Sequence, residues 1–146
     1  MADLTITDAQ IQSQPLSAGA SFEYSKTLGE DVDAAMRVLR LDGTLDKWYL
    51  ADADDESILT ETIGLSTSAG KLGQQIVVQK AGKIRFNGVG TAPGPFTAGV
   101  VRYISTTPGA LCLESDLATD DYVVRVGSPD DTELFTLDIK ALVVKG

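Results

Sequence analysis

Four acidic residues stand close together near the middle of the chain: Asp52, Asp54, Asp55 and Glu56. Their oxygens fall at alternating positions, as in the first half of a calcium-binding loop. The second half of such a loop is missing, because Ser57 stands where glycine is required and Ile63 where a bidentate glutamate is required. We therefore predict no metal site here, but a solvated loop or a short helix start with an aspartate N-cap.

Two further carboxylate pairs, Asp120–Asp121 and Asp130–Asp131, are the remaining candidates for acid–base chemistry. Two carboxylates across a cleft can hydrolyse glycosidic bonds, but both pairs fall in predicted turns, where Asp is favoured for local hydrogen bonding. The chain contains no histidine, which removes the usual general base, the Ser-His-Asp and Cys-His triads and most zinc sites. We predict a protein that is not an enzyme, with no catalytic residues, cofactor or metal.

The composition predicts a single folded domain that does not bind nucleic acid or anionic lipid. The 146 residues are 43% hydrophobic, enough for one real core. A net charge of −9 disfavours nucleic acid and anionic lipid as partners. No apolar run is long enough to span a membrane, and the first residues lack the pattern of a signal peptide. Cys112 lies between two leucines, so we expect it to be a small buried side chain.

Alternation of apolar and polar residues predicts a chain made mainly of antiparallel strands with one wetted face. The clearest alternating stretches are residues 21–25, 83–86, 101–103, 122–126 and 135–139. Residues 36–41, 48–50 and 75–79 are expected to form further strands. Helical signals are weak, and we expect at most one or two short helices, in residues 54–61 and near 116–118.

Turn residues separate these strands. Asp42-Gly43 and Thr107-Pro-Gly109 predict tight turns, and Ser128–Asp131 predicts another. Ala81-Gly82 separates two strand-like runs, 76–80 and 83–86, which we interpret as a hairpin. Residues 88–95 hold enough glycine and proline to predict an irregular loop.

The predicted fold is therefore all-β, a single small antiparallel β-sandwich or β-barrel domain with an extended N-terminal arm. We assign residues 1–20 to the arm and residues 21–146 to the domain. Leu4, Ile6 and Ile11 are spaced among polar residues in the arm. They favour either an edge strand or an arm whose apolar side chains bind a neighbouring subunit.

Four residues outside the arm are further candidates for a partner interface. Lys80, Lys83 and Arg85 fall in the predicted 76–86 hairpin and form either a modest positive patch or a strand face kept soluble by its cations. Trp48 alternates with Leu50, so it either packs in the core or anchors an interface.

The last third of the chain carries an ordered pattern: Tyr103-Ile-Ser-Thr-Thr-Pro-Gly109, Asp116-Leu117, Asp121–Gly127 and Leu137-Asp-Ile139. This pattern resembles the C-terminal half of small capsid-decoration (cement) proteins of tailed bacteriophages. Residues 29–34, 47–53, 63–65 and 73–78 resemble earlier strands and turns of the same family, so the resemblance covers roughly 29–139. Leu111–Glu114 departs from the more polar turn of the family pattern.

The resemblance implies a structural virion protein on the outer capsid surface, made in the cytoplasm of the bacterial host. Its partners would be the major capsid protein and further copies of itself, as a trimer or dimer. It would stabilise the expanded shell by bridging neighbouring capsomers. Two alternatives remain open from the sequence: a tail, collar or receptor-binding virion component, and a non-viral carbohydrate-binding β-module.

Overall fold

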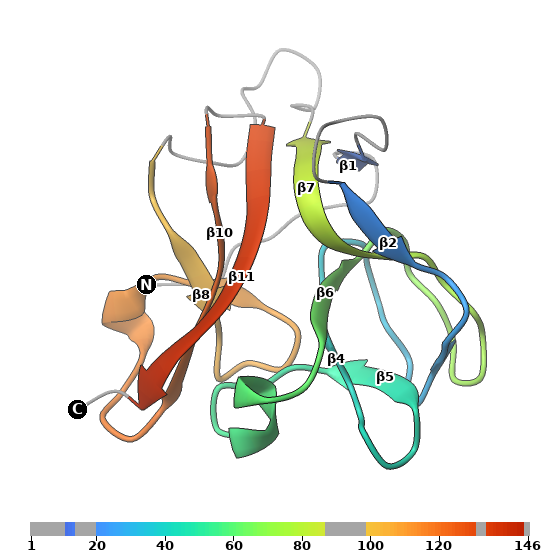
Figure 1. Cartoon of the computed structure of the whole chain (residues 1–146), viewed down its shortest axis with the longest axis horizontal. Helices are drawn as coiled ribbons and strands as arrows, with labels where there is room; N and C mark the ends of the chain where they lie inside the picture. The colour runs from blue at the N-terminus through green and yellow to red at the C-terminus, as the bar shows by residue number, and fades with distance from the viewer. Residues whose placement is uncertain (1–10, 14–19, 87–98, 131–133, 145–146) are drawn as a thin grey trace.

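The computed structural model describes residues 11–13, 20–86, 99–130 and 134–144, and it consists mostly of β-strands (Figure 1). The strands are β1 (Ile11–Ser13), β2 (Ser21–Glu23), β3 (Thr27–Leu28), β4 (Val38–Leu41), β5 (Lys47–Leu50), β6 (Ile63–Ser66), β7 (Val78–Phe86), β8 (Arg102–Ile104), β9 (Leu111–Cys112), β10 (Tyr122–Pro129) and β11 (Leu134–Val144). Two short 3₁₀ helices, η2 (Glu56–Leu59) and η3 (Glu114–Asp116), interrupt them. The all-β prediction is confirmed, and both short helices lie where the sequence favours them.

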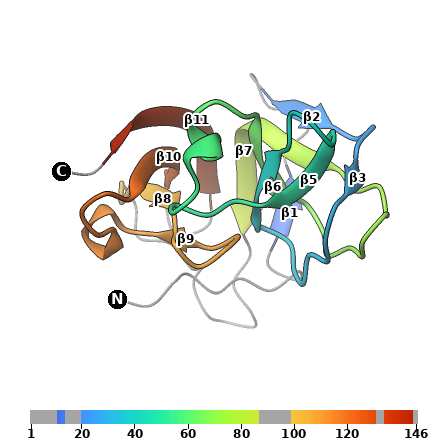
Figure 2. The same ribbon diagram turned by 90° about the horizontal axis from the view of Figure 1, so that it is seen from below.

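The strands form one open sheet in the order β3-β5-β4-β6-β7-β11-β10-β8-β9, with β1 and β2 also paired to β7. All pairs are antiparallel except β3 with β5, which makes the sheet mixed. The sheet bends so that its two halves, β3 to β6 and β8 to β11, lie on either side of η2 when the chain is seen from below (Figure 2).

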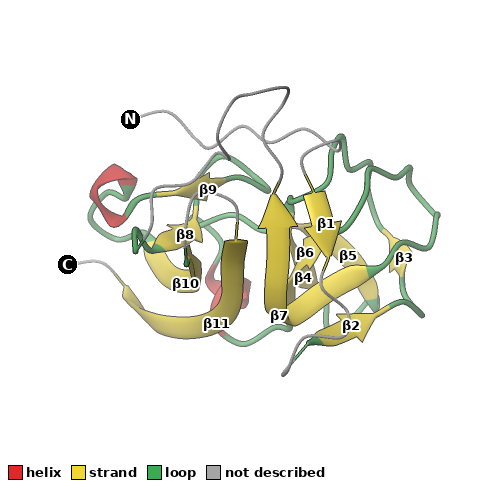
Figure 3. Ribbon diagram, turned by 90° about the horizontal axis from the view of Figure 1, so that it is seen from above, coloured by secondary structure: helices red, strands yellow, loops and turns green. Residues whose placement is uncertain are grey.

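The two halves share a single long strand, β7, which changes its neighbours on both edges partway along. On one edge, β6 pairs with Val78 and Gln79, and β11 then pairs with residues 81–85. On the other edge, β2 pairs with residues 78–81, and β1 pairs with residues 84–86. Figure 3 shows β1 and β11 on opposite sides of β7. The sheet passes from its first half to its second half at this change of neighbours.

The predicted hairpin at Ala81-Gly82 is wrong, because β7 runs through both residues without turning back. Gly82 has a φ of 97°, a conformation that side-chain-bearing residues rarely adopt, and it bends the strand instead of ending it. Ala20 packs closely here: a Cβ added to Gly82 would lie 2.6 Å from the Ala20 Cα. The glycine therefore marks a bend and a close backbone approach, two functions that sequence alone does not distinguish from a turn.

The main core lies between the two halves and draws apolar side chains from both. Its buried members include Val38, Leu65, Ile84, Ile104, Val124 and Phe135. A second cluster lies on the opposite face of β4 to β6 and contains Leu28, Val32, Leu39, Trp48, Ile76 and Val78. The first half of the sheet is thus buried on both faces, which accounts for its weak sequence alternation.

The turn predicted at Asp42-Gly43 is confirmed, although an aspartate controls it. Asp42 Oδ1 accepts hydrogen bonds from the backbone N–H groups of Thr44 and Leu45, at 2.9 and 2.7 Å. The left-handed residue is Asp46, with a φ of 58°, and not Gly43. The loop is therefore an Asx-stabilised turn that returns the chain from β4 to β5.

The Thr107–Gly109 turn is also confirmed, and it joins the two halves. Gly109 N–H donates to the Ala51 carbonyl at 2.8 Å, and Val38 N–H donates to the Gly109 carbonyl at 2.8 Å. Gly109 has a φ of 82°, and a Cβ at this position would lie 2.7 Å from Leu50 Cδ2. The turn between β8 and β9 is thereby fixed against β4 and β5.

Replacing Gly82 with alanine should destabilise the chain by roughly 3 kcal/mol, because it adds a clash with Ala20 to the cost of a left-handed backbone. Gly73, with a φ of 86° and nothing within 4 Å of an added Cβ, is the matched control. Gly73→Ala should cost only roughly 1 kcal/mol. Chemical denaturation measures both values, and equal losses would contradict the importance of the bend.

Candidate functional site: a charged groove between three loops

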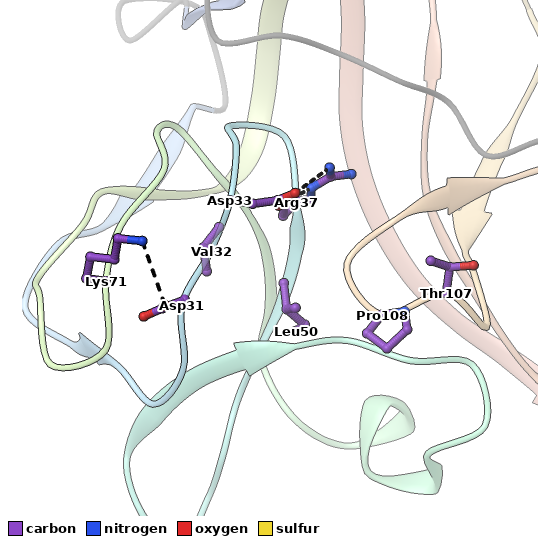
Figure 4. Close-up of a pocket in the computed structure, with 8 residues that line it drawn as sticks. All are labelled: Asp31, Val32, Asp33, Arg37, Leu50, Lys71, Thr107 and Pro108. Atoms are coloured by element: carbon purple, nitrogen blue, oxygen red, sulfur yellow. Dashed lines mark hydrogen bonds and ion pairs between the residues drawn. The ribbon is translucent and has the colours of Figure 1, made fainter.

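Three loops from distant parts of the sequence meet beside β5 and form an open groove of about 450 Å³ (Figure 4). Its lining residues combine charged and apolar side chains: Asp31, Val32, Asp33, Arg37, Leu50, Lys71, Thr107 and Pro108. Leu50, the last residue of β5, is the one lining residue that belongs to a strand of the described sheet. The groove therefore depends on how the loops are held.

The first wall is a pair of backbone segments that bind each other directly. Val32 N–H donates to the Gly70 carbonyl at 2.8 Å, and Gly70 N–H donates to the Val32 carbonyl at 2.9 Å. Asp31 Oδ1 accepts from the Leu72 N–H at 2.8 Å. Lys71 Nζ lies 3.8 Å from Asp31 Oδ2, a loose ion pair between two exposed side chains.

A carboxylate–guanidinium pair forms the second wall. Arg37 Nε donates to Asp33 Oδ1 at 2.8 Å, and Arg37 Nη2 donates to Asp33 Oδ2 at 3.1 Å. These hydrogen bonds, with the charge of Arg37, lower the pKa of Asp33. Ser66 fixes the turn below, since its Oγ donates to the Ala34 carbonyl and accepts from the Arg37 N–H.

The third wall comes from the other half of the sheet. Thr107 and Pro108 line the groove from the turn that Gly109 anchors to β4 and β5 (Figure 4). Ser105 Oγ accepts from the Thr107 N–H at 3.0 Å, which holds the turn in shape. The groove is thus a product of the contact between the two halves.

The groove offers an apolar surface bordered by paired charges. Leu50 and Pro108 supply apolar contact above the buried Val32, while both cations of the lining stand next to carboxylates. Its lining contains neither histidine nor cysteine, and no pairing of a nucleophile with a base. Such a surface is suited to binding a protein segment whose charges are complementary to those of the lining. Binding of this kind requires no catalytic residue.

The arm residues predicted as interface lie mostly outside the described part of the chain. Leu4 and Ile6 fall in residues 1–10, which the structure does not describe. Ile11 begins β1, where its backbone pairs with Phe86 at the end of β7. The segment 11–13 is therefore a strand on the edge of the sheet.

Trp48 packs in the core. Its side chain is 0% exposed and lies in the second cluster with Leu28 and Leu39. Its Nε1 makes no hydrogen bond to any residue that the structure describes. Of the two alternatives left open by the sequence, core packing is the one realised in this chain, and Trp48 offers no exposed anchor.

The three predicted basic residues lie along β7 and not on two strands of a hairpin. Lys83 Nζ bonds to Asp130 and, at 2.9 Å, to Thr136 Oγ1. Lys80 is partly buried, and the backbone of Arg85 lies between β1 and β11. Lys83 is therefore part of an intrachain network joining β7 to β11, which reduces its contribution to a positive patch.

The acidic loop serves local structure. Asp55 accepts hydrogen bonds from the N–H and Oγ of Ser57 and caps η2, as predicted, and these bonds lower the pKa of Asp55. Asp52 Oδ1 accepts from the Asp54 N–H at 2.8 Å. Within the described residues, no group of three or more potential ligands is placed to hold a metal ion.

A cation network supports the same region. Arg40 Nη1 donates to Glu61 Oε1 at 3.0 Å, and Arg40 Nε lies 3.4 Å from Asp55 Oδ2. The guanidinium also lies 5.3 Å from the centre of the Tyr49 ring. These contacts tie η2 and the start of β6 to β4.

Asp54 differs from its neighbours because its surroundings disfavour the charged form. Desolvation, the charge of Asp52, and contact with the Asp121 carboxyl raise the pKa of Asp54. Asp121 is itself buried, and its Oδ2 accepts from the Ala118 N–H at 2.7 Å. The turns at residues 52–55 and 118–121 therefore place two carboxyl groups, those of Asp54 and Asp121, next to each other.

Comparison with known proteins gives no relative: no family model matches the sequence, and neither a curated protein nor a solved structure is detectably similar. No helix among the described residues has the length and apolar character needed to cross a membrane.

Sequence reasoning missed the groove as a site. Asp31 and Asp33 fall in the 29–34 stretch, which predicts a turn before a strand and no site, and Arg37 and Lys71 belong to no motif. The Thr107–Gly109 pattern predicts a turn but not what it faces. The only local signal is the charge spacing of Asp33 and Arg37, four residues apart. The proximity of the three loops depends on long-range pairing, which a single sequence does not display.

Asp54→Asn should raise the thermal unfolding midpoint at pH 7, because it removes the repulsion between Asp54 and the carboxylates of Asp52 and Asp121. The gain should shrink as the pH falls through the raised pKa of Asp54, since the wild-type carboxyl then takes up its own proton. Asp138→Asn, an exposed charge removal on β11, should give no such pH-dependent gain. A gain that is constant with pH would contradict the assignment.

Proposed function

We propose that this protein is a structural virion component that binds the outer surface of an expanded bacteriophage capsid and stabilises it. Its partners would be the major capsid protein and further copies of this chain. The observation that carries the proposal is the ordered pattern over residues 103–139, which resembles capsid-decoration proteins and here forms the run from β8 to β11.

The structural roles of the residues in this pattern support a binding function. Gly109 joins the two halves of the sheet, and the stretch from Tyr122 to Val144 forms a long antiparallel pair. Gly109 and the β10–β11 pair thus have structural roles that need no catalytic group. A protein whose work is to bind in many copies requires such a rigid scaffold and an adhesive surface.

Stabilisation of a shell follows from binding alone. A protein that binds the expanded lattice and not its disassembled form stabilises that lattice by mass action, and many copies multiply the effect. The charge distribution is compatible with an external position. Segments 42–61 and 114–121 hold eleven of the 21 acidic residues and one basic residue, Lys47. Such a surface would be repelled by packaged DNA.

Purified protein mixed with expanded capsids that lack it should pellet with them and saturate at hundreds of copies per particle. The melting temperature of the capsids should rise in parallel, because the bound copies oppose disassembly. Sedimentation followed by quantitative gel analysis counts the copies. Saturation at a few dozen copies or fewer would favour a tail component, and binding to isolated glycans without capsid binding would favour a carbohydrate-binding module; either overturns the proposal.

The N-terminal arm supplies the second test. Removing residues 1–10 deletes Leu4 and Ile6 but keeps β1, whose backbone pairs with β7. If the arm adds a strand to a capsid subunit, this truncation should weaken capsid binding at least tenfold while leaving the unfolding midpoint close to that of the full chain. Unchanged capsid affinity would show that the arm is not part of the interface.

A further inference from the structure

The loop from Gly70 to Gln74 is unusually well fixed for a surface loop. All five of its backbone N–H groups donate hydrogen bonds, to the Val32 and Leu28 carbonyls, the Asp31 carboxylate, the Gln74 side chain and the Lys71 carbonyl. A loop with no unsatisfied donor has little conformational freedom left to lose on binding. We call residues 70–74 the Leu72 loop.

This rigid loop holds an apolar side chain in solvent. Leu72 is 65% exposed, one of four large apolar side chains that are exposed among the described residues, with Tyr24, Leu45 and Val77. Its neighbour Lys71 has a side chain that is 84% exposed and that makes a loose ion pair with Asp31. Leu72 and Lys71 are thus exposed side by side on a loop that is already ordered. These are the properties of residues that anchor a protein interface.

The groove described above is complementary to the Leu72 loop in both apolar surface and charge. Its apolar contact surface, the exposed Pro108 and the half-buried Leu50, is bordered by the carboxylates of Asp31 and Asp33, and the Asp33 side chain is 74% exposed although Arg37 binds it. A leucine entering from outside would meet apolar side chains, and a lysine beside it would meet carboxylates.

We propose that the Leu72 loop of one copy docks into the groove of a second copy, with Leu72 against Leu50 and Pro108 and Lys71 against Asp33. Loop and groove are adjacent on one surface, because Lys71 lines the groove of its own chain. A contact between two different surfaces of identical chains forms a closed ring when the rotation that relates successive copies closes. This inference rests on the homo-oligomer included in the proposed function and assigns its contact.

The distribution of charge favours this contact over one made through the acidic surface. The acidic segments 42–61 and 114–121 approach each other through Asp54 and Asp121. Bringing two copies together there would add like charges. At the Leu72 loop, a cation of one copy meets carboxylates of the next, and the apolar side chain lies between them.

Leu72→Asp should weaken self-association at least tenfold, because it places a carboxylate against Asp33 and removes the apolar anchor. Leu45→Asp is the matched control: Leu45 is 57% exposed and lies in the β4–β5 hairpin, outside the proposed contact. Sedimentation equilibrium at about 0.1 mM protein measures both variants against the wild type, with unfolding midpoints confirming that each is folded. A monomeric wild type, or equal effects of the two variants, would overturn the inference.

Cross-linking tests the contact independently of its strength. A Leu72→Cys variant mixed with a Pro108→Cys variant should form a disulfide-linked heterodimer on mild oxidation, because each cysteine comes from a different copy. The native Cys112 is buried, and a Leu45→Cys and Pro108→Cys mixture measures the background. No heterodimer above this background would overturn the contact.

These results separate the inference from the proposed function. Capsid binding by a chain that is monomeric at every concentration tested overturns the self-association contact and leaves the capsid proposal intact. Self-association through Leu72 without capsid binding overturns the capsid proposal and leaves the contact intact.

Discussion

The structure depends on the bend of β7 at Gly82. A straight strand would keep the same neighbours along its length and extend a flat sheet. Here the positive φ of Gly82 and the close packing of Ala20 allow β6 to give way to β11 on one edge, and β2 to β1 on the other. Because the sheet bends there, side chains from both halves bury one another in a common core.

The candidate site follows from that bend. Once the halves face each other, the turn at Thr107–Gly109 reaches β4 and β5 and hydrogen bonds to Val38 and Ala51. The same contact brings Pro108 opposite the loops that carry Asp31, Asp33 and Lys71. A binding surface made in this way combines residues from three segments while each segment stays locally rigid, which suits a protein proposed to act by adhesion.

Local structure could be predicted from the sequence where a side chain hydrogen bonds to the backbone close to it in the chain. The Asp42 turn, the Asp55 cap and the Thr107–Gly109 turn were all predicted, as was the all-β class from alternation. Gly82 was assigned to a hairpin because a glycine between two strand-like runs has the same local signal whether it turns or bends the chain. Only the distant partners β1, β2 and β11 decide between the two, and they are also what builds the groove.

The central claim is that this chain coats the outside of an expanded capsid. An icosahedral reconstruction of expanded capsids by electron cryomicroscopy, with and without added protein, tests it most directly. The account predicts difference density of the size of this chain, repeated at equivalent positions on the outer surface between neighbouring capsomers. The absence of difference density, or density confined to the inner surface or to the tail vertex, would contradict it.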